Sequence, residues 1–132
     1  MDERELEQVA RRHGIVLLLQ FGSTVTGRTH PASDVDLAVL VERTPRSLGE
    51  HADLLRDLQA VFPGREVDLA LINRADPLFL RKITEQCRLL HGSPARLAAL
   101  KMYAFRRYQD HRKYLALERE YVARSLRAMS AP

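Results

Sequence analysis

The chain has 132 residues, of which 45% are hydrophobic and 29% are charged, and this is the size and composition of one ordinary globular domain. No apolar run approaches the ~20 residues of a membrane-spanning helix, and the first residues, Met1 to Glu5, are too charged for a signal peptide. The single cysteine, Cys87, excludes an internal disulfide, so we expect a soluble protein of the reducing cytoplasm.

The formal net charge of +4 is unevenly distributed. Residues 1–80 hold nine Lys and Arg against thirteen Asp and Glu, a net charge of −4, whereas residues 81–132 hold twelve against four, a net charge of +8. This basic segment could bind nucleic acid, an acidic protein or the phosphates of a nucleotide. A solvated helix face that keeps the protein soluble is an equal alternative, and no recognised DNA-reading motif accompanies the charge.

The first two elements are a helix and a buried strand. Residues 2–13 place Leu6, Val9 and Ala10 on one side of a helix, and Gly14 is positioned to end it. Residues 15–21 are almost wholly apolar and do not alternate, which predicts a central strand that is buried on both faces.

A glycine-serine turn follows this strand at Gly22-Ser23. Residues 24–27 are long enough for about one helical turn, and residues 30–33 are predicted to form a loop. Because the first N–H groups of a helix have no backbone partner, such a turn can bind phosphate. An ordinary turn with a helix cap explains the same dipeptide.

Two carboxylates, Asp34 and Asp36, open the next predicted strand, residues 34–41. They are two residues apart, so their side chains point to the same face of a strand. Adjacent carboxylates repel each other, and the usual remedy is a bound divalent cation that prefers oxygen ligands, here Mg²⁺.

A third carboxylate lies in a later strand. Ser47 and Glu50 have the spacing of a capping box, and the helix that they open, ending near Val61, is predicted to bury one stripe (Leu48, Ala52, Leu55, Leu58 and Val61). The predicted strand 65–72 follows and carries Asp68. Alone, Asp68 fits a solvated sheet edge; beside Asp34 and Asp36 it becomes a candidate third metal ligand.

The last third of the chain is predicted to be helical. Asp76-Pro77 starts a helix that is expected to run to Gly92 and to contain Cys87 as a core residue. Residues 95–128 contain no proline or glycine and predict one helix of up to ~30 residues and ~45 Å. Five of the eight Tyr and Phe residues lie there among arginines, which suits a protein interface; a helix that packs on its own domain is the equal alternative.

Gly22-Ser23, the pair Asp34 and Asp36 ten residues later, and Asp68 on a further strand together resemble the signature of the DNA polymerase β-like nucleotidyltransferases. The short length is similar to the minimal nucleotidyltransferases, the MNT antitoxins found with HEPN-domain toxins. The resemblance implies an α/β (α+β) domain: a nucleotidyltransferase fold with a small mixed β-sheet of about three to five strands, flanking helices and a long C-terminal helix.

The resemblance also implies a function. Such antitoxins transfer AMP from ATP, with Mg²⁺, to a tyrosine of the HEPN toxin, an RNase, and also bind it. The metal ligands and catalytic residues would be Asp34, Asp36 and Asp68, with two Mg²⁺ ions expected. Gly22, Ser23, Thr24, Arg28 and Ser33 are the candidate nucleotide-binding residues. Many relatives carry arginine where this chain has Thr24 or Thr26, so either Arg28 compensates or triphosphate binding is weaker.

We therefore expect a single domain over residues 1–132, with a catalytic core in residues 1–92 and a partner-binding helix in residues 93–132. The leading hypothesis is a protein adenylyltransferase that neutralises a HEPN toxin. A binding-only antitoxin with a vestigial site and an aminoglycoside-type small-molecule nucleotidyltransferase are the alternatives. Neither a homo-oligomer nor direct nucleic-acid binding is excluded.

Overall fold

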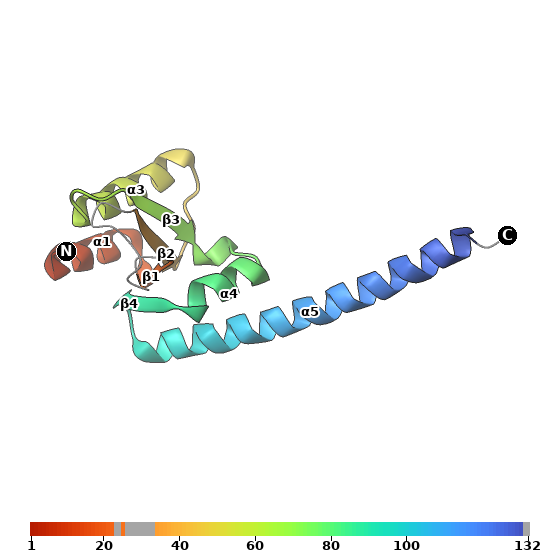
Figure 1. Cartoon of the computed structure of the whole chain (residues 1–132). Helices are drawn as coiled ribbons and strands as arrows, with labels where there is room; N and C mark the ends of the chain where they lie inside the picture. The colour runs from red at the N-terminus through yellow and green to blue at the C-terminus, as the bar shows by residue number, and fades with distance from the viewer. Residues whose placement is uncertain (23–24, 26–33, 131–132) are drawn as a thin grey trace.

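The computed structural model describes residues 1–22, 25 and 34–130. Figure 1 shows the order of the elements along the chain. They are α1 (Glu3–His13), β1 (Ile15–Phe21), β2 (Val35–Val41), α3 (Leu48–Val61), β3 (Val67–Leu71), the short 3₁₀ helix η1 (Ile72–Arg74), α4 (Pro77–Glu85), β4 (Cys87–His91) and α5 (Pro94–Ser130). Within this described part, no helix is long and apolar enough to cross a membrane.

The four described strands form one sheet in the order β3-β2-β1-β4. β1 is antiparallel to both of its neighbours, whereas β2 and β3 are parallel. The predicted mixed sheet is therefore confirmed, and β1 is an inner strand as its unbroken apolar sequence indicated. β3 is an outer strand, which leaves the outer side of the strand that carries Asp68 without a neighbouring described strand.

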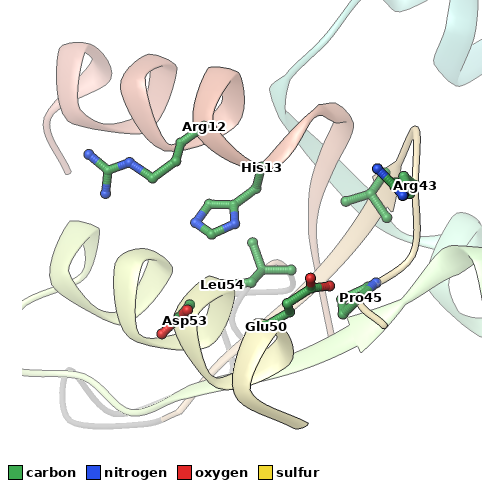
Figure 2. Close-up of a pocket in the computed structure, with 8 residues that line it drawn as sticks. Arg12, His13, Arg43, Pro45, Glu50, Asp53 and Leu54 are labelled. Atoms are coloured by element: carbon green, nitrogen blue, oxygen red, sulfur yellow. The ribbon is translucent and has the colours of Figure 1, made fainter. Parts of the chain in front are cut away.

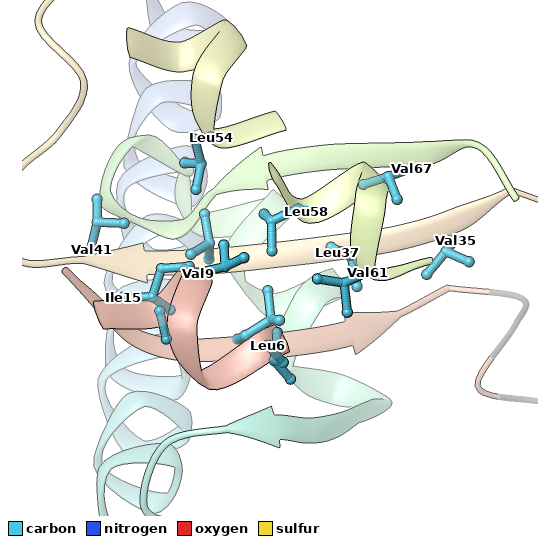
Figure 3. Packing of buried hydrophobic residues seen from close by; sticks show 13 residues of the cluster. Leu6, Val9, Ile15, Val35, Leu37, Val41, Leu54, Leu58, Val61 and Val67 are labelled. Carbon is cyan, nitrogen blue, oxygen red and sulfur yellow. The ribbon is translucent and has the colours of Figure 1, made fainter. Parts of the chain in front are cut away.

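Helices cover both faces of the sheet. On one face, α1 and α3 pack against it through a cluster that contains Leu6, Leu54 and Leu58 (Figure 3). On the other face, α4 and the beginning of α5 pack through a second cluster that contains Ile83 and Leu100. β1 contributes to both clusters, because successive side chains of a strand point to opposite faces.

Local sequence signals define the ends of α1 and α3. Gly14 ends α1 in the left-handed conformation, with φ of 64°, as predicted. The Ser47 side chain accepts a hydrogen bond of 3.2 Å from the Glu50 N–H, and the Glu50 carboxylate accepts one of 2.6 Å from the Arg46 N–H. The Ser47-Glu50 signal thus starts α3, although the return bond reaches Arg46 rather than Ser47 itself.

The predicted buried stripe of α3 is partly wrong. Leu58 and Val61 are buried, but Leu48 is 91% exposed and Ala52 is also exposed, while Leu54 is buried instead. The buried residues of α3 all lie from its middle onward, whereas Glu50 in its first turn lines a cavity. The prediction of a helix with one buried side was right, but the buried side begins at Leu54 instead of Leu48.

The predicted helix from residue 76 to 92 is wrong in its second half. α4 ends at Glu85, and Cys87–His91 form β4, which pairs with β1. The free side of β1 needs hydrogen-bond partners because its backbone is buried, and this segment supplies them. Cys87 therefore opens a strand instead of lying within a helix, although its packing in the α4-side cluster agrees with the predicted core role.

The long C-terminal helix is confirmed and extends further than predicted. α5 has 37 residues, of which Leu100 and Ala104 are buried. Figure 1 shows that the helix leaves the sheet and α4 behind and continues away from the rest of the chain. Its second half therefore has no described element packed against it.

Candidate functional site

Two of the predicted carboxylates face each other across neighbouring strands. Asp36 of β2 is the register partner of Asp68 of β3. On the other side of Asp36, its partner is Phe21, the last residue of β1. Phe21 in turn pairs with Cys87, the first residue of β4. One row of residues therefore crosses the whole sheet at the level of the carboxylates.

The alternation of each strand decides which face the carboxylates occupy. Val35 and Leu37 enter the cluster beneath α1 and α3, so Asp36 between them points to the opposite face. Val67 and Leu69 flank Asp68 in the same way. Both carboxylates consequently lie on the face covered by α4 and α5.

Asp34 lies immediately before β2 and is exposed. A hydrogen bond of 2.8 Å from the Val35 N–H to the Glu66 carbonyl aligns the beginnings of β2 and β3. The negative charge of Asp34 acts on Asp36 strongly enough to change its pKa. The structure thus pairs Asp36 with Asp68 and leaves Asp34 within electrostatic reach of Asp36.

Gly22 lies against the Asp36 carboxylate. Its φ of 81° is in the left-handed region that glycine favours. A Cβ atom at this position would lie 2.4 Å from Oδ2 of Asp36, far inside van der Waals contact. Glycine is therefore favoured both by the backbone turn and by the close approach of the carboxylate.

The electrostatics of the site favour a cation. Burial raises the pKa of the half-buried Asp36 above its usual value, and the charges of Asp68 and then Asp34 raise the pKa further. Lys82 of α4 acts in the opposite direction and lowers the pKa of Asp36. Sequence reasoning missed Lys82, because no motif links it to the carboxylates and only the packing of α4 brings it near them.

The donor set suits a hard divalent cation, since three carboxylates supply only oxygen. However, across residues 1–22, 25 and 34–130, no three His, Cys, Asp or Glu side chains are positioned closely enough to hold a metal ion. The other predicted nucleotide-binding residues, Ser23, Thr24, Arg28 and Ser33, lie outside the described residues. The catalytic, metal-binding and nucleotide-binding roles stay predictions.

A cavity of about 390 Å³ opens beside Asp68. It is lined by Phe21, by residues 68–71 of β3, by Arg74 and Ala75 before α4, by Phe79 of α4, and by His51 of α3. Most of its lining is apolar, and Phe21 and Phe79 meet edge to face at 6.0 Å between ring centroids. The carboxylate row therefore adjoins a space that a second molecule could enter.

A second cavity, of about 230 Å³, lies far from the carboxylates. Figure 2 shows Arg12 and His13 at the end of α1 facing Glu50 and Asp53 of α3 across it. It is also lined by Val41, at the end of β2 opposite to Asp36. Its lining mixes both signs of charge, and the carboxylates of the row are not among its lining residues.

With this geometry described, the chain can be assigned to a family. The family model described as Polymerase beta, Nucleotidyltransferase matches residues 4–95, which is more than half of the chain. The chain belongs to this nucleotidyltransferase family. The matched range contains the whole sheet and the three carboxylates, and it stops near the beginning of α5.

Several solved structures of toxin–antitoxin complexes have a similar fold. The chain is similar to a toxin–antitoxin structure with AMP-PNP (23% identity, TM-score 0.71, covering 96% of this chain and 98% of that one). It is also similar to a chain from a tri-AMPylated Shewanella oneidensis HEPN toxin in complex with an MNT antitoxin (21%, 0.65, 94% of each chain). An MntA-HepT toxin–antitoxin structure is a third (21%, 0.65, 94% and 95%). No curated protein matches the chain.

Proposed function

We propose that this nucleotidyltransferase is an antitoxin that transfers AMP from ATP to a tyrosine of a HEPN-domain toxin and thereby neutralises it. The observation that carries the proposal is the pairing of Asp36 with Asp68 across β2 and β3, with Gly22 against Asp36. Two fold neighbours support the nucleotide and the partner: one structure contains AMP-PNP, and another contains an AMPylated HEPN toxin with its antitoxin.

The carboxylates would hold the magnesium that this chemistry uses. Asp34, Asp36 and Asp68 offer oxygen ligands, and the raised pKa of Asp36 reflects negative charge that a cation would neutralise. When bound there, Mg²⁺ would orient the triphosphate, offset its charge and lower the pKa of an attacking hydroxyl. The close approach of Asp36 to Gly22 keeps this donor set beside the end of β1.

In the proposed reaction, the tyrosine oxygen attacks the α-phosphorus of ATP, the bond from that phosphorus to the bridging oxygen breaks, and pyrophosphate leaves. Asp68 is exposed on an outer strand beside the 390 Å³ cavity, where it can meet an incoming hydroxyl and accept its proton. Gly22, with Ser23, Thr24, Arg28 and Ser33, is assigned to the nucleotide. Positioning and charge neutralisation supply most of the catalysis in such transfers.

The second half of α5 is the proposed toxin-binding surface. Beyond the part of α5 that packs on the domain, it exposes six large apolar side chains, namely Tyr114, Leu117, Tyr121, Val122, Leu126 and Met129. Exposed apolar residues of this number on one element are typical of an interface. Tyr and Arg, which interfaces favour, alternate along it.

The direct test is to mix the purified protein with ATP, Mg²⁺ and the HEPN toxin encoded beside it, and to weigh the intact toxin. The expected result is a gain of AMP mass that requires Mg²⁺ and that maps to a tyrosine. If a toxin with RNase activity gains no AMP mass in this assay, the enzymatic proposal is wrong. An adjacent reading frame without a HEPN protein would remove the proposed partner.

The exposed half of α5 also favours a second candidate, an antitoxin that neutralises by binding alone. Asp34→Asn/Asp36→Asn separates the two, because it removes the proposed metal ligands and leaves α5 unchanged. If the double variant still neutralises the toxin at matched expression, binding is sufficient. If the complex forms but the toxin stays active, transfer is required.

A further inference from the structure

We propose that Lys82 contacts the β- and γ-phosphates of the nucleotide from the α4 side of the carboxylate row. The proposal rests on the proposed use of ATP and adds a residue that no motif of the sequence identifies. It makes Lys82 a nucleotide-positioning residue, with its ammonium group opposite the phosphate oxygens.

The packing of α4 places Lys82 at the level of the row. α4 ends at Glu85, two residues before Cys87, which is itself the row member on β4. One turn before Lys82, the Phe79 ring packs edge to face on Phe21, the neighbour of Asp36 in the row. Residues three apart share a helix face, so Lys82 continues the face that Phe79 turns toward the carboxylates.

Burial and charge separate Lys82 from its neighbours on α4. Ile83 is fully buried in the cluster beneath the helix, whereas Lys82 is exposed. The Arg81 guanidinium stacks on the Tyr108 ring, 4.0 Å from its centroid, and so holds α4 to α5. In the described part of the chain Lys82 makes no ion pair, yet its charge reaches Asp36 and lowers the pKa of that carboxyl.

This arrangement is suited to an anion that itself binds beside the carboxylates. A lysine ammonium is a compact charge with three donors on a flexible stem, which lets it follow a phosphate chain. The alternative is that Lys82 only offsets the charge of Asp36 and has no ligand. The proposal and this alternative differ in one respect. If Lys82 contacts the phosphates, its replacement should weaken the binding of a triphosphate more than the binding of a monophosphate.

The experiment measures binding of AMP-PNP and of AMP to the full chain in Mg²⁺ by calorimetry. Lys82→Gln should weaken AMP-PNP binding about tenfold, the usual loss for a hydrogen bond to a charged group. It should change AMP binding by less than about twofold, because AMP lacks the phosphates that Lys82 is proposed to contact. Lys82→Arg should restore most of the affinity. Arg4→Gln, which removes an exposed charge on α1 at the other face of the sheet, is the control and should bind as wild type.

Each outcome is decisive. Equal losses for AMP and AMP-PNP, or unchanged AMP-PNP binding by Lys82→Gln, would overturn the role of Lys82 while leaving the proposed function standing. If the wild-type protein does not bind AMP-PNP, both the proposed function and the role of Lys82 are wrong. Thermal melts without nucleotide accompany the titrations, and a Lys82→Gln protein that melts as wild type while losing only triphosphate affinity supports the contact.

Discussion

Replacing Gly22 by alanine tests whether the glycine is needed for its left-handed backbone conformation or for the close approach of the Asp36 carboxylate. The backbone φ of 81° alone should cost about 1–2 kcal/mol in the left-handed region. Alanine also lowers the conformational entropy of the unfolded chain, which offsets about 0.4–1 kcal/mol of this cost. The new Cβ atom, 2.4 Å from Oδ2 of Asp36, must in addition displace that carboxylate from its rotamer, at about 1 kcal/mol.

Gly64 provides a matched control within the same chain. Its φ is 79°, and a Cβ atom added there would meet nothing within 4 Å. Gly64→Ala should therefore show the backbone cost alone, roughly 1 kcal/mol. Gly22→Ala should cost about 1 kcal/mol more, which corresponds to a further fall of about 4 °C in Tm for a domain of this size.

Urea unfolding followed by circular dichroism gives the free energies of unfolding, and calorimetry with AMP-PNP and Mg²⁺ follows the site. We expect Gly22→Ala to lose nucleotide binding, whereas Gly64→Ala binds as wild type. In an Asp36→Ala background the extra cost of Gly22→Ala should vanish, because the carboxylate that the new Cβ meets is gone. If the extra cost persists there, or if both glycine variants cost the same and bind equally, the reasoning is refuted.

Three further predictions follow from the structure. Asp36→Asn removes one of three neighbouring negative charges, so it should abolish transfer without lowering the Tm of the metal-free protein; a fall of several degrees would contradict this. Asp57 accepts hydrogen bonds from His13 at 2.7 Å and from Arg12 at 3.0 Å, and these bonds, that from His13 first, lower the pKa of its carboxyl. Its stabilisation is therefore present above the unfolded pKa of about 3.9 and is lost as pH falls through the lower folded value. Asp57→Asn should accordingly unfold about 1 kcal/mol more easily at pH 7, and the difference from wild type should shrink as pH falls below about 4, as urea titrations at several pH values can show. Truncation after His111 keeps the buried part of α5, so the Tm should change by less than about 3 °C while toxin capture is lost; retained capture in a pull-down would place the toxin surface elsewhere.

Much of this protein was determined by local sequence. The residues around Gly14 and Ser47 fix helix ends through groups a few positions apart, and the unbroken apolar run of β1 defines an inner strand. The spacing of Asp34 and Asp36 predicted two carboxylates on one face of a strand, and β2 contains Asp36 whereas Asp34 immediately precedes it. These features depend on short-range geometry, so they could be predicted without the rest of the chain.

Only the tertiary structure decided which distant segments meet. Residues 87–91 form a strand because the free side of β1 needs partners there, a requirement that their own sequence does not express. Asp68 faces Asp36 because β3 pairs with β2 in parallel in this register, and the charge of Lys82 reaches Asp36 because α4 packs on β1. Pairing and packing act between residues far apart in sequence, so the sequence supplied the carboxylates, and the fold brought them together and added the lysine.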